Sequence, residues 1–438
     1  MAERHRHNVG AEEAPIGPPI ADVAIVGGGP VGLMLACLLV QRGLTIVVLE
    51  ARVRGSAHSR AIGIHPPGLA TLAQIGLADA AIAAGTPIFR GEAWCDGELL
   101  GALEIAEASA RYPFVLSLPQ RETEKLLRER LIELCGGTDP IVRGARVAGF
   151  SQRNDAVHIR CESVDGAEGE AGDSSPPTVH ARYLVGADGA RSRVREHSRI
   201  RWSAVAEPQP YVMGDFRGAA IAVPVVETGH GRHGRAAARI AATTALLAFE
   251  RGGVVESFPL PGGWRRWVVL TERLKAAPTA RDLARTVRER TGIDVPLAEN
   301  DAEDASHTDA SLSAFAVQQH FAERMAVGRI ALVGDAAHEV SPIGGQGMNL
   351  GWLDAAALAP ALELALSGGN AVAHRALVEY DRRRRAAAQR AILQASFNMG
   401  VGQPASGTRL AMRNAVVRAL ARPPFRTLLA RAFTMRGL

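Results

Sequence analysis

The chain has 438 residues, of which 47% are hydrophobic and 22% are charged. These fractions are typical of a soluble globular protein, and the length suggests two or three domains. The formal net charge is +5, with acids and arginines interspersed along most of the chain, which argues against nucleic-acid binding. The four cysteines show no C-x-x-C spacing, so we predict no metal site and expect reduced thiols in a cytoplasmic protein.

Residues 21–50 have the pattern of a strand, a glycine-rich turn, a helix and a second strand. Gly27, Gly29 and Gly32 follow an apolar run with the spacing G-x-G-x-x-G. In such a turn the first glycine permits the bend, the second lets the backbone approach a pyrophosphate, and the third lets helix and strand pack closely. The phosphates then lie at the positive N-terminus of the helix. The segment therefore predicts a dinucleotide site.

Glu50 ends the second strand, eighteen residues after Gly32. A carboxylate there can accept hydrogen bonds from ribose hydroxyls and would repel a 2′-phosphate, which favours FAD or NAD over NADP at this site. The competing interpretation is a membrane anchor, because residues 23–40 carry no charge. The glycines and the proline within that stretch argue against a membrane-spanning helix.

Two later loops also follow apolar strands. The strand from Val179 leads into Asp188 and Gly189, although Asp-Gly is also ordinary turn chemistry. A second strand, residues 330–333, leads into Gly334 and Asp335. The loop that follows is rich in glycine and could present several backbone N–H groups to an anion or a ring carbonyl; it contains Pro342, Gly344, Gly345 and Gly347.

With these three motifs in this order, the chain from about Ala21 onward resembles the FAD-dependent aromatic hydroxylases of the para-hydroxybenzoate hydroxylase fold. Within that group it is most similar to the ubiquinone-pathway and aromatic polyketide hydroxylases. The resemblance implies that the first glycine turn holds the FAD pyrophosphate and that Glu50 binds the adenosine ribose. It also implies that Asp188 and Gly189 serve FAD and pyridine nucleotide, and that Gly334 and Asp335 hold the ribityl chain.

The resemblance further implies contacts with the flavin ring. The loop beside the isoalloxazine would carry the catalytic backbone groups, which we assign to Pro342, Gly344, Gly345 and Gly347. Additional cofactor contacts are expected from Arg60, Gln120, Met348 and Asn349.

The implied fold is α/β, with a Rossmann-like FAD-binding domain, an inserted mixed β-sheet substrate domain and a C-terminal helical segment. Residues 201–307 are strand-rich and alternating, as expected for the substrate sheet, to which residues 90–111 would contribute. The other predicted units are a disordered tail (1–20), the discontinuous FAD-binding domain (21–200 and 308–370) and the C-terminal helices (371–438). The polar tail lacks the apolar core of a signal peptide.

The implied activity is monooxygenation. NADPH or NADH would reduce FAD, and a C4a-hydroperoxyflavin would hydroxylate an electron-rich aromatic compound such as a phenol, resorcinol, quinol or polyketide. A base would help to ionise the phenol, but none of the candidates is favoured: His65, His338, Tyr211 and Asp215. Two alternatives stay open, which are a flavin-dependent oxidase or dehydrogenase on the same scaffold and a non-catalytic protein that binds an aromatic ligand.

The C-terminal segment from Arg409 to Leu438 contains seven arginines and no acid. One interpretation is a helical layer that packs on the flavin domain. The other is a basic amphipathic surface that contacts an anionic membrane or a lipid-tailed substrate. The sequence does not distinguish a monomer from a homodimer.

Overall fold

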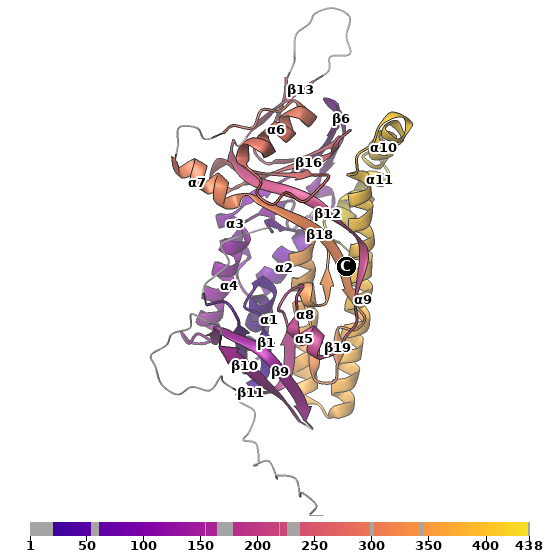
Figure 1. Cartoon of the computed structure of the whole chain (residues 1–438). Helices are drawn as coiled ribbons and strands as arrows, with labels where there is room; N and C mark the ends of the chain where they lie inside the picture. The colour runs from indigo at the N-terminus through magenta and orange to yellow at the C-terminus, as the bar shows by residue number, and fades with distance from the viewer. Residues whose placement is uncertain are drawn as a thin grey trace, which may run out of the picture.

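The computed structural model describes residues 21–53, 61–153, 155–163, 178–218, 220–225, 237–297, 302–341 and 345–436. Three predicted site residues, Arg60, Pro342 and Gly344, lie outside these ranges, as does the predicted tail 1–20. The described residues form an α/β fold with two eight-stranded sheets and a helical C-terminal segment (Figure 1). The predicted fold class is confirmed.

The first sheet is centred on β1 (Ala21–Val26), which pairs in parallel with β11 (Thr178–Gly186) and with β2 (Ile46–Glu50). Buried parallel strands are nearly continuous apolar runs, and this explains the uncharged residues 23–26 of β1. The other members are β8 (Ile141–Arg143), β9 (Ala145–Arg153), β10 (Ala156–Ser163), β19 (Ala326–Val327) and β20 (Ile330–Leu332).

Three helices build the core beside this sheet. Helix α1 (Pro30–Val40) packs against both α4 (Gln120–Leu134) and α8 (Gln346–Ser367). The membrane-anchor interpretation of residues 23–40 is wrong, because a strand, a turn and a buried helix occupy them. Helix α8 is itself long and apolar enough to cross a membrane, but most of its apolar stretch is buried inside the fold.

The second sheet is antiparallel except where β15 (Thr244–Glu250) pairs in parallel with β5 (Arg90–Cys95). Its other strands are β6 (Glu98–Glu104), β12 (Trp202–Arg217), β16 (Gly253–Leu260), β17 (Trp264–Leu270), β18 (Ser313–Ala322) and β21 (His338–Glu339). Strands β5 and β6 lie within residues 90–111. Because β18 and β21 also belong here, the sheet continues past the predicted boundary at residue 307.

The two faces of the second sheet differ. Side chains alternate between the faces along each strand. One face carries Val255 and Trp267, which pack against Leu283 and Val287 of α6 (Ala280–Thr291) in a closed apolar core. The opposite face turns toward the first sheet and lines a cavity with Tyr211, Met213, Val254, Glu256 and Val268.

Helix α9 (Asn370–Val401) runs alongside both sheets (Figure 1). After it, α10 (Gly407–Leu420) packs on β6, and α11 (Phe425–Phe433) packs on β6 and residues 105–107. The C-terminal layer therefore covers the second sheet, and its last residues also reach the FAD-binding domain, where Phe433 contacts His65 and Met435 packs in a cluster with Leu350. The remaining elements are α2 (Pro66–Gln74), α3 (Ala78–Ala84), α5 (Arg193–His197), α7 (Ala302–Ser311), β3 (Gly63–Ile64), β4 (Thr86–Ile88), β7 (Val115–Ser117), β13 (Ile221–Pro224) and β14 (Ala237–Ile240).

Arg413 anchors this C-terminal layer. Its guanidinium donates to the carbonyl oxygens of Gln403, at 3.2 Å, and of Phe249. It also contacts the Cys95 Sγ at 3.6 Å, within a group of potential metal ligands formed by Cys95, Asp96 and Glu250.

Candidate active site

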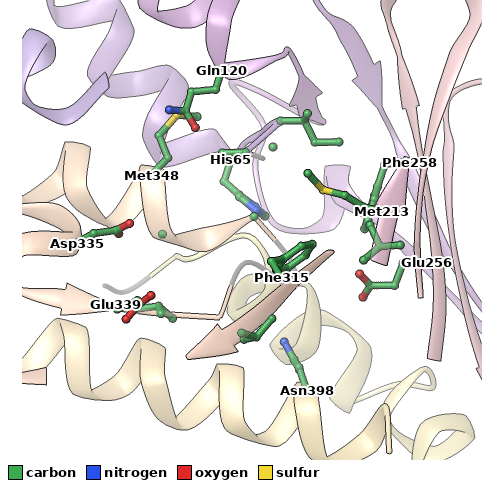
Figure 2. Close-up of a pocket in the computed structure, with 18 of the residues that line it drawn as sticks. His65, Gln120, Met213, Glu256, Phe258, Phe315, Asp335, Glu339, Met348 and Asn398 are labelled. Atoms are coloured by element: carbon green, nitrogen blue, oxygen red, sulfur yellow. The ribbon is translucent and has the colours of Figure 1, made fainter. Parts of the chain in front are cut away.

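A cavity of about 820 Å³ extends from the glycine turn after β1 to the inner face of the second sheet. This volume is within the range of small-molecule sites. Figure 2 shows part of its lining, with Asp335 and Met348 at one end and Glu256 and Phe258 at the other. The cavity thus joins the predicted nucleotide site to the predicted substrate domain.

The three glycines of the turn have three different geometries. Gly27 has a φ of +108°, and a Cβ there would lie 2.3 Å from the carbonyl oxygen of Ala187. A Cβ on Gly32 would lie 2.0 Å from the Gly27 carbonyl oxygen. Gly29, by contrast, lines the cavity and has no atom within 4 Å of a Cβ position. These geometries match the bend, the close packing and the open approach that a pyrophosphate turn requires.

Glu50 closes the turn from the end of β2. Its Oε2 accepts a hydrogen bond from the Gly28 N–H at 2.8 Å, and its Oε1 accepts one from the Arg52 N–H at 2.8 Å. Burial acts to raise the pKa of Glu50, but hydrogen bonds and charge from Arg52 outweigh it and lower the pKa. Glu50 is therefore ionised and lines the cavity, where a ribose could bind.

Asp188 and Gly189 form the loop after β11. The Asp188 carboxylate accepts hydrogen bonds from the Ser192 hydroxyl and from the backbone N–H groups of Arg193, at 2.7 Å, and Val194, at 3.2 Å. Gly189 has a φ of +78°, a conformation that favours glycine. Both residues line the cavity. The Asp188 side chain is occupied in shaping the loop and capping α5, so a ligand would meet the loop mainly through its backbone.

Asp335 follows β20 and points into the cavity (Figure 2). It lies deep in the fold but its side chain faces the open cavity, and burial raises its pKa to about 6, with His338 acting in the opposite direction. The preceding Gly334 has a φ of +60° and does not line the cavity. Gly334 thus shapes the turn, while Asp335 presents the polar group.

A buried ionic network supports this turn from behind. Asp354 of α8 accepts hydrogen bonds from the Gly334 N–H at 3.1 Å and the Arg384 Nε at 2.7 Å, and it contacts the His338 Nε2 at 2.6 Å. Burial acts to raise the pKa of Asp354, but His338 and Arg384 outweigh it and lower the pKa. Because His338 is fully buried in this network, it is a positioning residue and not the substrate base considered from the sequence.

The described part of the glycine loop begins at Gly345, which caps α8. Its φ is +66°, and a Cβ would approach the Gly63 Cα to 3.3 Å, so a side chain here would be strained. Gly347 lines the cavity, and a Cβ there would lie 3.8 Å from the Asp335 Oδ1. Met348 lines the same wall. These residues surround the Asp335 end of the cavity.

Asn349 forms hydrogen bonds with residues of the cavity wall. Its side chain is fully buried and does not line the cavity. The Oδ1 accepts from the His65 N–H at 2.9 Å, and the Nδ2 donates to the carbonyl oxygens of Gly63 and Gly345, both at 2.8 Å. These three hydrogen bonds tie the cavity wall together, and the contact of Asn349 with the cofactor stays a prediction.

Gln120 lies at the N-terminus of α4 and lines the cavity. Its backbone N–H donates to the Ala61 carbonyl at 3.0 Å, and its Nε2 donates to the Glu124 Oε1 at 2.8 Å. These two hydrogen bonds hold Gln120 in a fixed orientation in the cavity wall.

Of the other base candidates, Asp215 and Tyr211 belong to β12 of the second sheet, and His65 precedes α2. Asp215 is buried in a bidentate pair with Arg266, at 2.7 and 2.9 Å, and does not line the cavity. Tyr211 lines the cavity, but burial raises the pKa of its hydroxyl above the usual value. His65 lines the cavity beside Phe433, with ring centres 5.7 Å apart.

Several lining residues were not anticipated from the sequence. Glu256 comes from β16, Phe315 from β18 and Asn398 from α9 (Figure 2). The one signal available in the sequence was the single acid within the otherwise uncharged strand Gly253–Leu260. A buried-strand carboxyl is unusual enough to mark a functional candidate.

The parallel sheet, the glycine turn at a helix N-terminus and the acid at the end of β2 define a dinucleotide-binding fold of the flavoprotein class. The chain belongs to the FAD-binding-domain family, whose sequence model matches residues 20–395. The open approach at Gly29, the ionised Glu50 and the cavity-facing Asp335 suit an FAD molecule lying along the cavity. The predicted cofactor is thus confirmed at the level of the family.

Relatives with known names support the same assignment. The chain is 33% identical over 349 residues to a 6-methylpretetramide 4-monooxygenase of Streptomyces rimosus, which covers 78% of this chain and 56% of the relative. It is 32% identical over 338 residues to a rifampicin monooxygenase of Streptomyces venezuelae, which covers 76% of this chain and 62% of the relative. The chain therefore spans about 56–62% of the length of these two relatives.

Solved structures agree with the fold. An anhydrotetracycline hydroxylase of Streptomyces rimosus matches with a TM-score of 0.70 and 27% identity, covering 95% of this chain and 76% of that one. A p-nitrophenol 4-monooxygenase of Pseudomonas putida matches with a TM-score of 0.74 and 23% identity, covering 96% of this chain and all of the other. The predicted resemblance to FAD-dependent aromatic hydroxylases is confirmed.

Proposed function

We propose that this protein is an FAD-dependent monooxygenase that uses NADPH or NADH to hydroxylate an electron-rich aromatic compound. The observation that carries the proposal is the continuous cavity, which has nucleotide-binding geometry at Gly29 and Glu50 and an aromatic, largely apolar lining at Phe258 and Phe315. An aromatic ring bound at the second-sheet end of the cavity would face a cofactor bound at the Asp335 end. The named activities of the relatives support the same chemistry.

In this proposal the chain binds FAD and the aromatic substrate, orients them and excludes water from the cavity. FAD, when bound, supplies the redox chemistry with NAD(P)H and O2. Backbone N–H groups at the N-terminus of α8, around Gly345 and Gly347, would stabilise negative charge on the reduced ring system. The network of Asp354, His338 and Arg384 would keep the Asp335 turn in place. The second sheet and α9 would enclose the aromatic substrate.

We expect NADPH or NADH oxidation by the FAD-loaded protein to be stimulated by members of a panel of phenols, resorcinols and quinols. Product masses should increase by one oxygen atom, and isotopically labelled O2 should supply it. Stimulation without label in the product would identify an oxidase or dehydrogenase. Binding without any stimulation would identify a non-catalytic aromatic-binding protein. Either result would overturn the proposed activity.

The C-terminal arginines carry a separate proposal of peripheral membrane contact. Within the described chain, Arg418 pairs with Glu98 at 2.6 Å and Arg426 pairs with Glu107 at 2.7 Å, and Arg413 is buried. Met412 and Leu428, however, are 66% and 67% exposed, and they lie on helices that carry further arginines. We expect flotation with anionic vesicles at low salt and its loss in Met412→Ser/Leu428→Ser. Absence of flotation at low salt would remove the proposal.

A further inference from the structure

Glu256 is a carboxylate placed in an apolar chamber. It lies in the middle of β16, is only 3% exposed and lines the cavity. Its cross-strand neighbours are Leu247 on β15 and Val268 on β17, which cannot hydrogen-bond to it. No group in the described part of the chain forms a hydrogen bond or an ion pair with the Glu256 carboxylate.

The polar groups around Glu256 have other partners or point into the same space. Arg266, the basic residue that this sheet contributes to the described lining, is bound to Asp215. Glu92 on β5 is bound to Arg90 and to the Trp94 Nε1 at 3.0 Å. Figure 2 shows Glu256 of β16 and Asn398 of α9 near Phe315, on two different sides of the chamber, with Met213 above Glu256 in this view.

A buried carboxyl without a partner is costly, because burial disfavours its charged form. Burial alone raises the pKa of Glu256 to about 7, and the nearby Tyr211 hydroxyl stays protonated because burial raises its pKa. The site therefore contains an acceptor that lacks a donor, at the end of the cavity where the aromatic substrate is proposed to bind. A hydroxyl group of a ligand would supply the missing hydrogen-bond donor.

We propose that the Glu256 carboxylate accepts a hydrogen bond from a hydroxyl group of a neutral aromatic ligand, and thereby selects hydroxyl-bearing aromatics against those that carry an acidic group. The inference rests on the proposed function, because it takes an aromatic ligand to occupy this end of the cavity. The Glu256 carboxylate would repel a carboxylate or phenolate ligand. The ion pair of Arg266 with Asp215 already neutralises the arginine that could attract such an anion. An ether would leave the acceptor unpaired.

Three matched ligands test this proposal: 2-naphthol, which offers a hydroxyl donor; 2-methoxynaphthalene, which does not; and 2-naphthoate, which is anionic. Binding to the FAD-loaded protein is measured by fluorescence titration without NAD(P)H. We expect 2-naphthol to bind most tightly at about pH 8, by roughly tenfold over the ether, as one charge-assisted hydrogen bond provides. The naphthoate should bind most weakly. Below the pKa of Glu256, at about pH 5.5, the preference for naphthol should shrink.

The Glu256→Leu variant should lose the preference for 2-naphthol over its ether at both pH values. The Glu256→Gln variant should keep a reduced preference, lose its pH dependence and bind 2-naphthoate more tightly than the parent. A matched control is Glu250→Gln on the neighbouring strand, because Glu250 is also a buried acid with a pKa raised by burial to about 7, but it accepts from the Asp96 N–H at 3.1 Å and does not line the cavity. Glu250→Gln should preserve the parental order and its pH dependence.

The proposal is overturned if both Glu256 variants retain FAD and bind the three ligands in the parental order with the parental ratios. It is also overturned if the control changes the order as much as the Glu256 variants do. Because the titration involves no turnover, its result is separate from the activity. A protein that selects naphthol through Glu256 but never oxidises NAD(P)H supports this inference and contradicts the proposed function.

Discussion

Replacing Gly29 with valine should give a folded protein that no longer retains FAD, whereas the same substitution at Gly32 should destabilise the fold itself. The structure separates the two cases, because a Cβ at Gly29 meets no atom within 4 Å, while a Cβ at Gly32 would lie 2.0 Å from the Gly27 carbonyl oxygen. The valine at position 29 would project into the approach of the pyrophosphate. The valine at position 32 would force α1 away from β1.

For Gly29→Val we expect an affinity for FAD lower by about a hundredfold or more, which corresponds to about 3 kcal/mol. For Gly32→Val we expect a loss of about 3 kcal/mol or more in the free energy of unfolding, as overpacking against backbone produces. Flavin released on heating, together with the melting temperature of each FAD-free protein, measures both effects. A Gly29→Val protein that keeps its flavin, or one that melts as early as Gly32→Val, would show that the turn is not built as described.

Removing the Asp354 carboxylate should have the second large effect. Asp354→Ala would leave the Arg384 guanidinium and His338 buried without their shared partner and would free the Gly334 N–H. Breaking a buried ionic network in this way costs about 3–5 kcal/mol. Asp354→Asn should recover part of the loss, because an amide can still accept from Gly334. Urea unfolding of the FAD-free proteins measures the differences.

The pH dependence of this effect has a definite sign. The pKa of Asp354 is lower in the folded protein than its ordinary value, so its stabilising contribution is complete above that ordinary value and is lost as the pH falls through the folded-state pKa. The cost of Asp354→Ala should therefore be largest near neutral pH and shrink in acid. Glu379→Ala is the control, because Glu379 also pairs with arginines on α9 but at the exposed surface, where ion pairs contribute little. An equal loss of stability in both variants would contradict the assigned network.

The sequence was most informative where function depends on local chain geometry. The roles of Gly27, Gly29 and Gly32 follow from a few consecutive residues, because the bend, the helix N-terminus and the close packing are all made within one turn. The place of Glu50 at the end of β2, beside the glycine turn, could likewise be predicted from its separation from the turn in the sequence. The overall fold was implied by the family resemblance that the three motifs carry.

Sequence reasoning failed where a residue's role depends on distant partners. The hydrogen bond of Asn349 to His65, which is 284 positions away, could not be predicted from the glycine loop that precedes Asn349. Glu256 was missed because the face of β16 that it occupies is decided by pairing with β15 and β17 and by which face α6 covers. Strand β18 lies beyond the predicted boundary at residue 307, and its sequence gives no local sign that it pairs with β12.

The membership of β18 in one sheet and β20 in the other has a consequence for how the chain reaches its native state. β12 is completed on one side only by residues 313–322, and the end of β11 only by residues 330–332. A chain emerging from the ribosome therefore has to keep two unpaired strand edges from aggregating until more than 320 residues have been made. Both sheets can therefore be completed only late in synthesis, around the cavity that they line together.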